Sequence, residues 1–185
     1  VLALPPWSAG ALLEASGLES GPTGAFEPEP IATAWALWHA DHAPSLPRWS
    51  LLDEDPARGR HGQWLFDRGV AHAGGEHPAR ARVAGIVISV ASRLDGLSPE
   101  AVAAGVSAQI TEAFGGPPPA AMRLVTERRA TFRCTPQRPR LRPDHFGDRA
   151  DGLWLAGDWL WPDYPATLEA AVRSGQAAAA LALRR

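Results

Sequence analysis

Residues 153–185 read LWLAGDWLWPDYPATLEAAVRSGQAAAALALRR, and three patterns follow one another along this stretch. The apolar run LWLA ends at Gly157 and Asp158, which is typical of a buried strand that enters a turn. The aromatic segment 159–165 contains two prolines, so it is not a regular helix. From Thr167 onward apolar residues recur with the period of an amphipathic helix. The stretch therefore predicts a strand, a loop and a helix, with an acid at the end of the strand.

The predicted helix and the acid before it suit a particular kind of ligand. N–H groups near Thr167 and Leu168 can face negative charge, with the help of the helix dipole. Asp158 can accept hydrogen bonds from sugar-like hydroxyls. A cofactor with hydroxyls and electron-withdrawing carbonyls would fit both features. An ordinary strand-turn-helix, with Asp158 in the turn and Thr167 as N-cap, explains the same pattern. The stripe of the helix consists of Leu168, Ala171, Val172, Gly175, Ala178, Ala179 and Ala182.

Composition narrows the class of protein. The chain has 185 residues, 45% of them hydrophobic and 21% charged, which is ordinary for a globular protein. A formal net charge of −2 gives no broad basic field, so we expect no nucleic acid partner. The single cysteine, Cys134, excludes an intramolecular disulfide and favours a reducing, cytoplasmic compartment. No apolar run is long enough to span a bilayer, and the pattern of a basic and then apolar leader does not occur in residues 1–185.

The order of the predicted elements indicates two domains. Strands are expected at 1–4, 31–38, 63–67, 82–91, 122–134 and 153–156, and helices at 7–18, 99–114 and from 167. The alternation in 31–38 predicts a strand with both faces covered, and Ala11, Leu12 and Ala15 form the stripe of the first helix. We interpret the fold as α/β with a β-rich insertion. Its domain ranges are 1–24 and 146–185 for one domain and 25–145 for the other. Because the chain opens directly on a hydrophobic strand, we expect it to be the C-terminal part of a longer polypeptide.

Several kinds of active site find no support in the sequence. The six histidines are expected in polar segments or at a strand end without ligand partners at metal-binding spacing, so we predict no metal site. There is no G-x-S-x-G, no Walker sequence and no G-x-G-x-x-G. Arg133 could lower the pKa of Cys134, but a lone thiol on a strand favours a structural role. Among the eight tryptophans, strand positions favour a core role, whereas Trp159 and Trp161 in the loop favour an apolar cavity beside a flat cofactor.

Three motifs in the final stretch carry a resemblance to a known family. AGDW at 156–159, PATLE at 165–169 and AVRSG at 171–175 closely resemble the C-terminal FAD motif of the amine oxidase and phytoene desaturase superfamily. Within it the chain is most similar to the hydroxysqualene dehydroxylases. Softer matches are VLALPP at 1–6, GQWLFDRG at 62–69, VISVASRL at 87–94 and ERRATFRCTP at 127–136. The sequence departs from the family at Leu160 (Thr), Asp163-Tyr164 (a Thr-Gly-like pair) and Ala170 (Gly), which alters the fine shape of the pocket.

The resemblance implies the C-terminal portion of a two-domain, Rossmann-like FAD enzyme with a β-rich substrate domain. Asp158 should bind the ribityl hydroxyls, and the backbone at Thr167 and Leu168 should approach the flavin pyrimidine edge. The cofactor-binding residues expected from the motifs are Gly157, Asp158, Trp159, Pro165, Ala166, Thr167 and Leu168. The glycine-rich pyrophosphate loop would lie in a missing N-terminal half of the same polypeptide.

The implied reaction is the reductive dehydroxylation of hydroxysqualene, a long isoprenoid, to squalene. The expected substrate pocket contains Trp64, Phe66, Trp161 and Tyr164, and the positions to test for catalysis are Asp67, Arg128 and Arg129. A hydrocarbon substrate also implies peripheral association with the inner face of the membrane. Two alternatives stay open: a carotenoid desaturase or amine oxidase, and a truncated, non-catalytic fragment that does not bind FAD alone.

Overall fold

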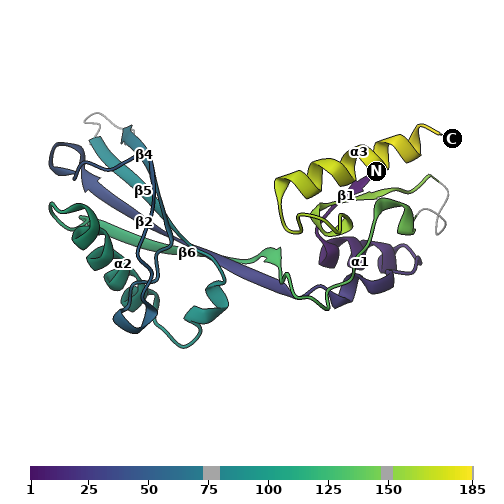
Figure 1. Ribbon diagram of the computed structural model, residues 1–185, viewed down its shortest axis with the longest axis horizontal. Helices are drawn as coiled ribbons and strands as arrows, with labels where there is room; N and C mark the ends of the chain where they lie inside the picture. Colours follow the sequence, from purple (N-terminus) through teal and green to yellow (C-terminus); the bar gives the residue numbers. More distant parts are fainter. Residues whose placement is uncertain (73–79, 147–151, 185) are drawn as a thin grey trace. The chain divides into compact units, whose positions relative to one another are not determined.

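A computed structural model describes residues 1–72, 80–146 and 152–184. The chain forms two compact units (Figure 1). Unit 1 combines Val1–Pro28 with Thr131–Arg185, and unit 2 is Glu29–Ala130. The borders differ from the predicted ranges because residues on both sides of unit 2, such as Phe26 and Phe132, pack into the core of unit 1. The assignment of the ranges as cofactor and substrate domains stays a prediction.

Unit 2 is built on a five-stranded sheet with the strand order β3-β4-β5-β2-β6. The strands are β2 (Pro28–His39), β3 (Trp49–Leu51), β4 (Trp64–His72), β5 (Arg80–Ile88) and β6 (Ala121–Phe132). The pairs β3–β4, β4–β5 and β2–β5 are antiparallel. The long helix α2 (Pro99–Phe114) begins as predicted, because the Ser98 side chain accepts a hydrogen bond of 3.1 Å from the N–H of Ala101. The short strand β3 was not predicted.

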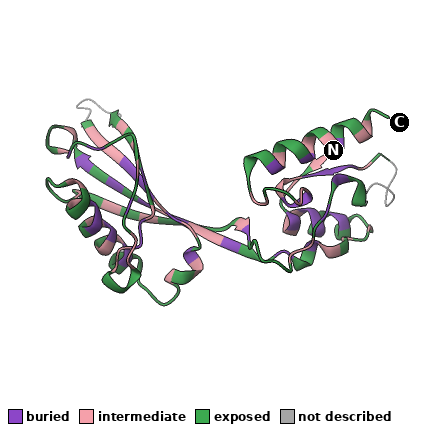
Figure 2. Ribbon diagram, in the orientation of Figure 1, coloured by how far each residue is buried: buried purple, intermediate pink, exposed green. Residues whose placement is uncertain are grey.

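Helix α2 covers one face of this sheet. Val102, Val106 and Ile110 on the helix are at most 1% exposed and belong to one core cluster with alternate residues of the strands. The residues of β2 that point the other way are more open: Trp35 is 38% and Leu37 is 37% exposed. Figure 2 shows this alternation along the strands. The prediction that both faces of 31–38 are covered is therefore wrong within the described chain, because α2 packs on one face.

Unit 1 joins the two ends of the chain. The strand β1 (Leu2–Ala3) pairs in parallel with β7 (Leu155–Ala156), with Leu2 opposite Leu155. Around this pair lie α1 (Pro6–Ala15) and α3 (Leu168–Ala182). Its main core cluster contains Ala9, Leu13, Phe26, Phe132, Leu141, Leu155, Trp159 and Leu160. Short 3-10 helices are η1 (Gly21–Ala25) and η5 (Pro143–Phe146), with η6 (Asp158–Leu160) directly after β7; in unit 2 they are η2 (Ala40–His42), η3 (Pro56–Arg58) and η4 (Ala91–Leu94).

Helix α1 buries other residues than its predicted stripe, whereas α3 buries Ala178 of its predicted stripe together with two residues outside it. Helix α1 buries Ala9 and Leu13, whereas Leu12 is 46% exposed, so the predicted stripe is wrong. The face of α1 that carries Gly10 packs against Thr23, and only glycine permits this close contact, since a Cβ at position 10 would lie 2.4 Å from Thr23 Oγ1. Helix α3 buries the small residues Ala170, Ser174 and Ala178. Small side chains at every fourth position let the helix approach β7 closely.

None of the helices in the described residues is both long and apolar enough to cross a membrane.

Candidate functional site

The end of β7 is tied to the middle of α3 by one buried serine. Ser174 is fully buried, and its hydroxyl oxygen accepts a hydrogen bond of 2.9 Å from the backbone N–H of Gly157. The same hydroxyl donates to the carbonyl of Ala171 at 3.1 Å. This side chain fixes the turn after β7 relative to α3. Ser174 is the serine of the AVRSG motif, but no role was predicted for it.

Gly157 lies directly beneath the Trp159 indole. A Cβ at Gly157 would stand 2.5 Å from the indole Nε1 of Trp159, a distance that side chains do not reach. The indole N–H in turn donates to the carbonyl of Leu4 at 2.9 Å, next to β1. Trp159 is 1% exposed and contacts Phe26 edge-on. It is therefore a core residue of unit 1 that shapes the turn, rather than the wall of an open cavity.

Asp158 follows immediately and is half-buried. Burial raises the pKa of its carboxyl above the ordinary value of 3.8, and hydrogen bonds from the backbone N–H groups of Trp159 and of Asp158 itself oppose that rise. Among the residues that the structure covers, no cation forms an ion pair with this carboxylate. A partly desolvated carboxylate without a counter-cation retains acceptor capacity for neutral donors such as hydroxyls.

Helix α3 begins at Leu168 with Thr167 as its N-cap, as predicted. The Thr167 hydroxyl accepts from the N–H of Ala170 at 3.2 Å and donates to the carbonyl of Tyr164. The first backbone hydrogen bond of α3 runs from the Ala171 N–H to the Thr167 carbonyl, so the N–H groups of Leu168 and Glu169 have no acceptor within the helix and the positive end of the helix dipole is open there. Leu168 is 87% and Val172 is 56% exposed, so this first turn presents N–H groups and an uncovered apolar surface together.

The loop before α3 contains two residues in the left-handed region. Tyr164 has φ +55° and Ala166 has φ +56°, with Pro165 between them. Such backbone strain persists where the surroundings impose it, and it concentrates at binding sites. Tyr164 stands where the resembled family has a glycine-like position, which the positive φ explains. Its ring is 59% exposed, with the guanidinium of Arg173 5.4 Å from its centroid.

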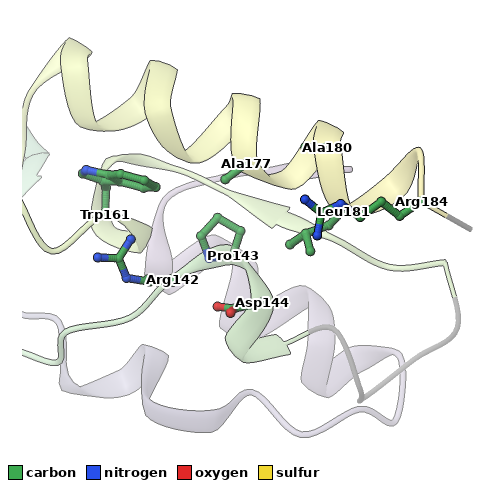
Figure 3. A pocket seen from close by; sticks show the side chains of 8 residues that line it. All are labelled: Arg142, Pro143, Asp144, Trp161, Ala177, Ala180, Leu181 and Arg184. Carbon is green, nitrogen blue, oxygen red and sulfur yellow. The ribbon is translucent and has the colours of Figure 1, made fainter.

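Trp161, an earlier residue of the same loop, lines a cavity beneath α3. Figure 3 shows its ring with Arg142 beside it, and the guanidinium carbon stands 4.9 Å from the ring centroid. The cavity has a volume of about 240 Å³ and is lined by Arg142, Pro143, Asp144, Trp161, Ala177, Ala180, Leu181 and Arg184. The indole N–H of Trp161 is buried and has no acceptor among the described residues.

Trp64 and Phe66, the other two predicted pocket residues, lie in unit 2. Their rings stack with centroids 6.4 Å apart, and Trp49 approaches Trp64 at 5.9 Å. All three side chains are at least 38% exposed and lie on the sheet face opposite α2. One row across this face reads Trp49, Phe66, Gly85 and Trp35 in register. The Trp35 ring covers Gly85, since a Cβ there would meet it at 3.2 Å. We call this surface the aromatic face.

The positions selected for tests of catalysis have different environments. Burial alone would raise the pKa of the Asp67 carboxyl, but hydrogen bonds from Arg82 and from the N–H of Gly69 hold it below its ordinary value. The ion pair between Asp67 and Arg82 measures 2.6 Å and indicates a structural role. Arg128 lines a cavity beside α2, with residues such as Leu94 and Val102. Arg129 is an exposed residue of β6.

Cys134 is exposed and does not have the features of a nucleophile. The pKa of its thiol is raised by partial desolvation of the sulfur and by the charge of Asp158, and the charge of Arg138 opposes this only in part. A raised pKa leaves less thiolate, which contradicts the expectation that Arg133 lowers it. The part of the chain that the structure describes brings no three His, Cys, Asp or Glu side chains together at a metal-binding distance. His77 lies outside the described residues.

Comparison with known proteins identifies the family of this chain. The model of the flavin containing amine oxidoreductases matches residues 33–183. The chain belongs to this family. The prediction of FAD as cofactor and the resemblance seen in the AGDW, PATLE and AVRSG motifs are thereby confirmed.

Curated relatives of this flavin amine oxidoreductase chain carry one name. Hydroxysqualene dehydroxylase from Sinorhizobium fredii (strain NBRC 101917 / NGR234) is 39% identical over 124 residues, which are 65% of this chain and 26% of the relative. Hydroxysqualene dehydroxylase from Rhodopseudomonas palustris (strain ATCC BAA-98 / CGA009) is 41% identical over 101 residues, 53% of this chain and 23% of the relative. The matched stretch thus spans about a quarter of the length of these relatives.

Solved structures share the fold at low identity. A protein described as a protoporphyrinogen oxidase from Exiguobacterium sp. 255-15 has a TM-score of 0.61 at 12% identity, over 100% of this chain and 41% of that one. Cyclohexylamine oxidase from Brevibacterium oxydans IH-35A has a TM-score of 0.54 at 15% identity, over 99% and 42%. The predicted fold class, a part of the two-domain α/β flavoenzyme fold, is confirmed.

The residues of unit 1 fit the cofactor of this family. Asp158 has free acceptor capacity at the end of β7, and α3, the helix that Ser174 ties to this turn, offers N–H donors at its N-terminus. The large exposed side chains on α3 and the preceding loop, Leu168, Val172 and Tyr164, leave an uncovered apolar surface next to these polar groups. Polar groups with apolar surroundings are what a flavin, with its ribityl hydroxyls and flat ring, requires.

Proposed function

We propose that the protein is part of an FAD-dependent oxidoreductase that converts hydroxysqualene to squalene by reductive dehydroxylation. The observation that carries the proposal is that Asp158, with unused acceptor capacity, directly follows β7, and that Ser174 ties this turn to α3, the helix whose first N–H groups have no acceptor within it. The substrate is proposed from the name shared by the curated relatives, which are 39% and 41% identical to this chain.

In this proposal unit 1 contributes one wall of the flavin site. Asp158 accepts hydrogen bonds from ribityl hydroxyls, and the N–H groups at Thr167 and Leu168 approach the pyrimidine edge. Donors held there favour negative charge on the ring without reorganisation. The remaining wall residues are Gly157, Trp159, Pro165 and Ala166. Gly157 and Trp159 act through the shape of the turn, since Trp159 is buried.

The aromatic face of unit 2 is the proposed binding surface for the hydrocarbon chain. Trp49, Trp64 and Phe66 are stiff, apolar and partly exposed, so they provide contact area at a small cost in side-chain entropy. A contiguous exposed apolar surface on a sheet usually marks a binding site. The role of Trp161 and Tyr164, in unit 1, as substrate contacts stays a separate prediction from the sequence. Apart from the hydroxyl that is removed, hydroxysqualene is hydrocarbon along its length, which matches the apolar composition of the aromatic face.

When bound, reduced FAD would supply the hydride equivalent that replaces the allylic hydroxyl, and solvent would supply the proton with which that hydroxyl leaves as water. The chain's own residues bind and orient. Asp67 is not the proton donor in this proposal, because it is held as a carboxylate by Arg82. The hydrocarbon substrate also supports peripheral association with the inner membrane face, which sedimentation with phospholipid vesicles tests.

A product assay on the full-length gene product tests the proposal. The purified protein should be yellow, and hydroxysqualene with a chemical reductant should yield squalene under anaerobic conditions. The Asp158→Ala variant should lose bound flavin, whereas Asp163→Ala, which changes an exposed acid of the same loop, should retain it. Turnover of phytoene or of an amine, with no squalene formed, would replace the reaction while keeping the flavin. A colourless full-length protein would favour the interpretation as a non-catalytic fragment and end the proposal.

A further inference from the structure

The segment TPQRPRLRP at 135–143 runs beside the loop that precedes α3. Two of its arginines contact consecutive residues of that loop. The Nη2 of Arg138 donates to the carbonyl of Pro162 at 2.8 Å. The Arg142 guanidinium stands over the ring of Trp161, 4.9 Å from the centroid (Figure 3). These four residues all belong to unit 1.

The loop requires such external contacts because its own conformation is unfavourable. Tyr164 and Ala166 both adopt a positive φ. The Trp161 indole N–H is buried without an acceptor among the described residues, which carries a desolvation penalty. Residues of this kind persist when the surrounding structure determines their position. Arg138 and Arg142 contact Pro162 and Trp161, which come shortly before the strained residues of the loop. These contacts can therefore fix the backbone that enters the strained part.

The arginine segment is itself anchored. Leu141, between the two contacts, is 5% exposed and belongs to the core cluster that contains Trp159. Arg138 also donates to the carbonyl of Pro139 at 3.4 Å, which orients its guanidinium. Arg140, the third arginine, is exposed. Arg142 is exposed as well, but it contacts the Trp161 ring, whereas Arg140 makes no contact with the loop among the described residues.

We propose that Arg138 and Arg142 are positioning residues of the flavin site: by holding Pro162 and Trp161 they set where the loop ends and hence where the N-terminus of α3 meets the flavin. This inference rests on the proposed function. Neither arginine needs to touch the cofactor. Each acts through the loop, whose last residue, Thr167, caps the helix.

The two contacts differ in what they demand of the side chain. The Arg138 guanidinium donates to two carbonyls at once, to Pro162 from Nη2 and to Pro139 from Nη1, and lysine does not reproduce this planar fork. The contact with Trp161 needs a cation over a ring, which an ammonium group can also provide. Lysine should therefore rescue position 142 better than position 138.

The test uses the full-length holoprotein, with FAD titrated into apoprotein. Arg138→Met and Arg142→Met should each weaken FAD binding about tenfold and shift the visible spectrum of the bound flavin. Arg142→Lys should restore most of the affinity, and Arg138→Lys should not. The matched control, Arg140→Met, should stay within about twofold of wild type. Thermal unfolding of each apoprotein separates a change at the site from a loss of folded protein.

Three results would overturn the inference in distinguishable ways. If wild type binds FAD but the Met variants at 138 and 142 match Arg140→Met in affinity and spectrum, the arginines do not position the site while the proposed function stands. The arginines are also excluded as positioning residues if the affinity of the Met variants falls only in proportion to unfolded protein. If wild type itself binds no FAD, the proposed function fails and this inference fails with it.

Discussion

The hydroxyl of Ser174 accepts a hydrogen bond of 2.9 Å from the backbone N–H of Gly157, seventeen residues earlier. This bond joins the turn that carries Asp158 to the helix that carries Thr167. The two polar elements of the candidate site are thus held to each other by one buried side chain as well as by the loop between them.

Ser174→Ala should lower the free energy of unfolding by about 1–3 kcal/mol, because the Gly157 N–H is left without its acceptor. It should also weaken FAD binding by the full-length protein. Denaturant unfolding measures the first effect and FAD titration the second. Gln176→Ala, an exposed change in the same helix, is the control and should leave both unchanged. Equal stability of the two variants would contradict the role given to Ser174.

Asp158→Asn should stabilise the apoprotein at neutral pH and weaken its FAD binding. Burial raises the pKa of the folded-state carboxyl above 3.8, so the folded protein binds this proton more tightly than the unfolded chain. The stabilisation from protonation is complete below the unfolded pKa and is lost as the pH rises through the raised folded pKa. The advantage of Asn over wild type should therefore disappear on acidification.

Urea unfolding of both proteins between neutral pH and pH near 3.8 follows this difference. Asp163→Asn, in the exposed part of the loop, serves as the control for a general change in net charge. A difference between Asp158→Asn and wild type that grows on acidification would have the wrong sign and would contradict the assignment.

Replacement by phenylalanine should have different effects on stability at Trp159 and at Trp161, although only one residue separates them. Trp159→Phe removes the hydrogen bond to the Leu4 carbonyl and leaves a space in the core, so it should cost about 2–4 kcal/mol of unfolding free energy. Trp161→Phe removes an N–H that has no acceptor among the described residues and keeps a ring for Arg142, so it should be neutral or slightly stabilising. Thermal and urea unfolding compare the two variants, and a larger loss for Trp161→Phe would refute the distinction.

At position 164, branching at Cβ should affect stability more than the identity of the side chain does. Tyr164→Val should be less stable than Tyr164→Gly by about 1–2 kcal/mol, because a β-branched residue is strained at the φ of +55°. Both variants lose the contact with Arg173, so the pair is matched for that effect. Equal unfolding midpoints for the two variants would show that the loop adopts another conformation.

On the aromatic face, Trp64→Leu should raise the KM for hydroxysqualene about tenfold with a smaller effect on kcat, since it removes binding surface and no reacting group. Steady-state kinetics of the full-length enzyme measure this. Leu97→Ala, another exposed apolar position of unit 2, is the control and should leave KM unchanged. A fall in kcat at constant KM would place Trp64 closer to the chemistry than proposed.

Local sequence patterns predicted well where the helices α2 and α3 begin. Ser98 and Thr167 are N-caps because their hydroxyls bond N–H groups three residues ahead, a relationship visible in sequence. The apolar stripe predicted only part of the buried face of α3, since Ala178 belongs to the stripe but Ala170 and Ser174 do not. Helix packing against β7 selects the small residues, so Leu168 and Val172 lie exposed. The contacts of Arg138 with Pro162 and of Ser174 with Gly157 depend on tertiary structure and leave no periodic signal.

The pairing of β1 with β7 has a consequence for the order of folding. Leu2 meets Leu155, and the Trp159 indole reaches back to Leu4, so unit 1 closes only by joining segments about 150 residues apart. Such distant contacts carry a large loop-closure entropy and form slowly. Unit 2 lies wholly between them and has its own core. During synthesis this insertion emerges before the C-terminal segment and shortens the effective loop as it folds, so the sheet of unit 2 helps the two ends of unit 1 to meet.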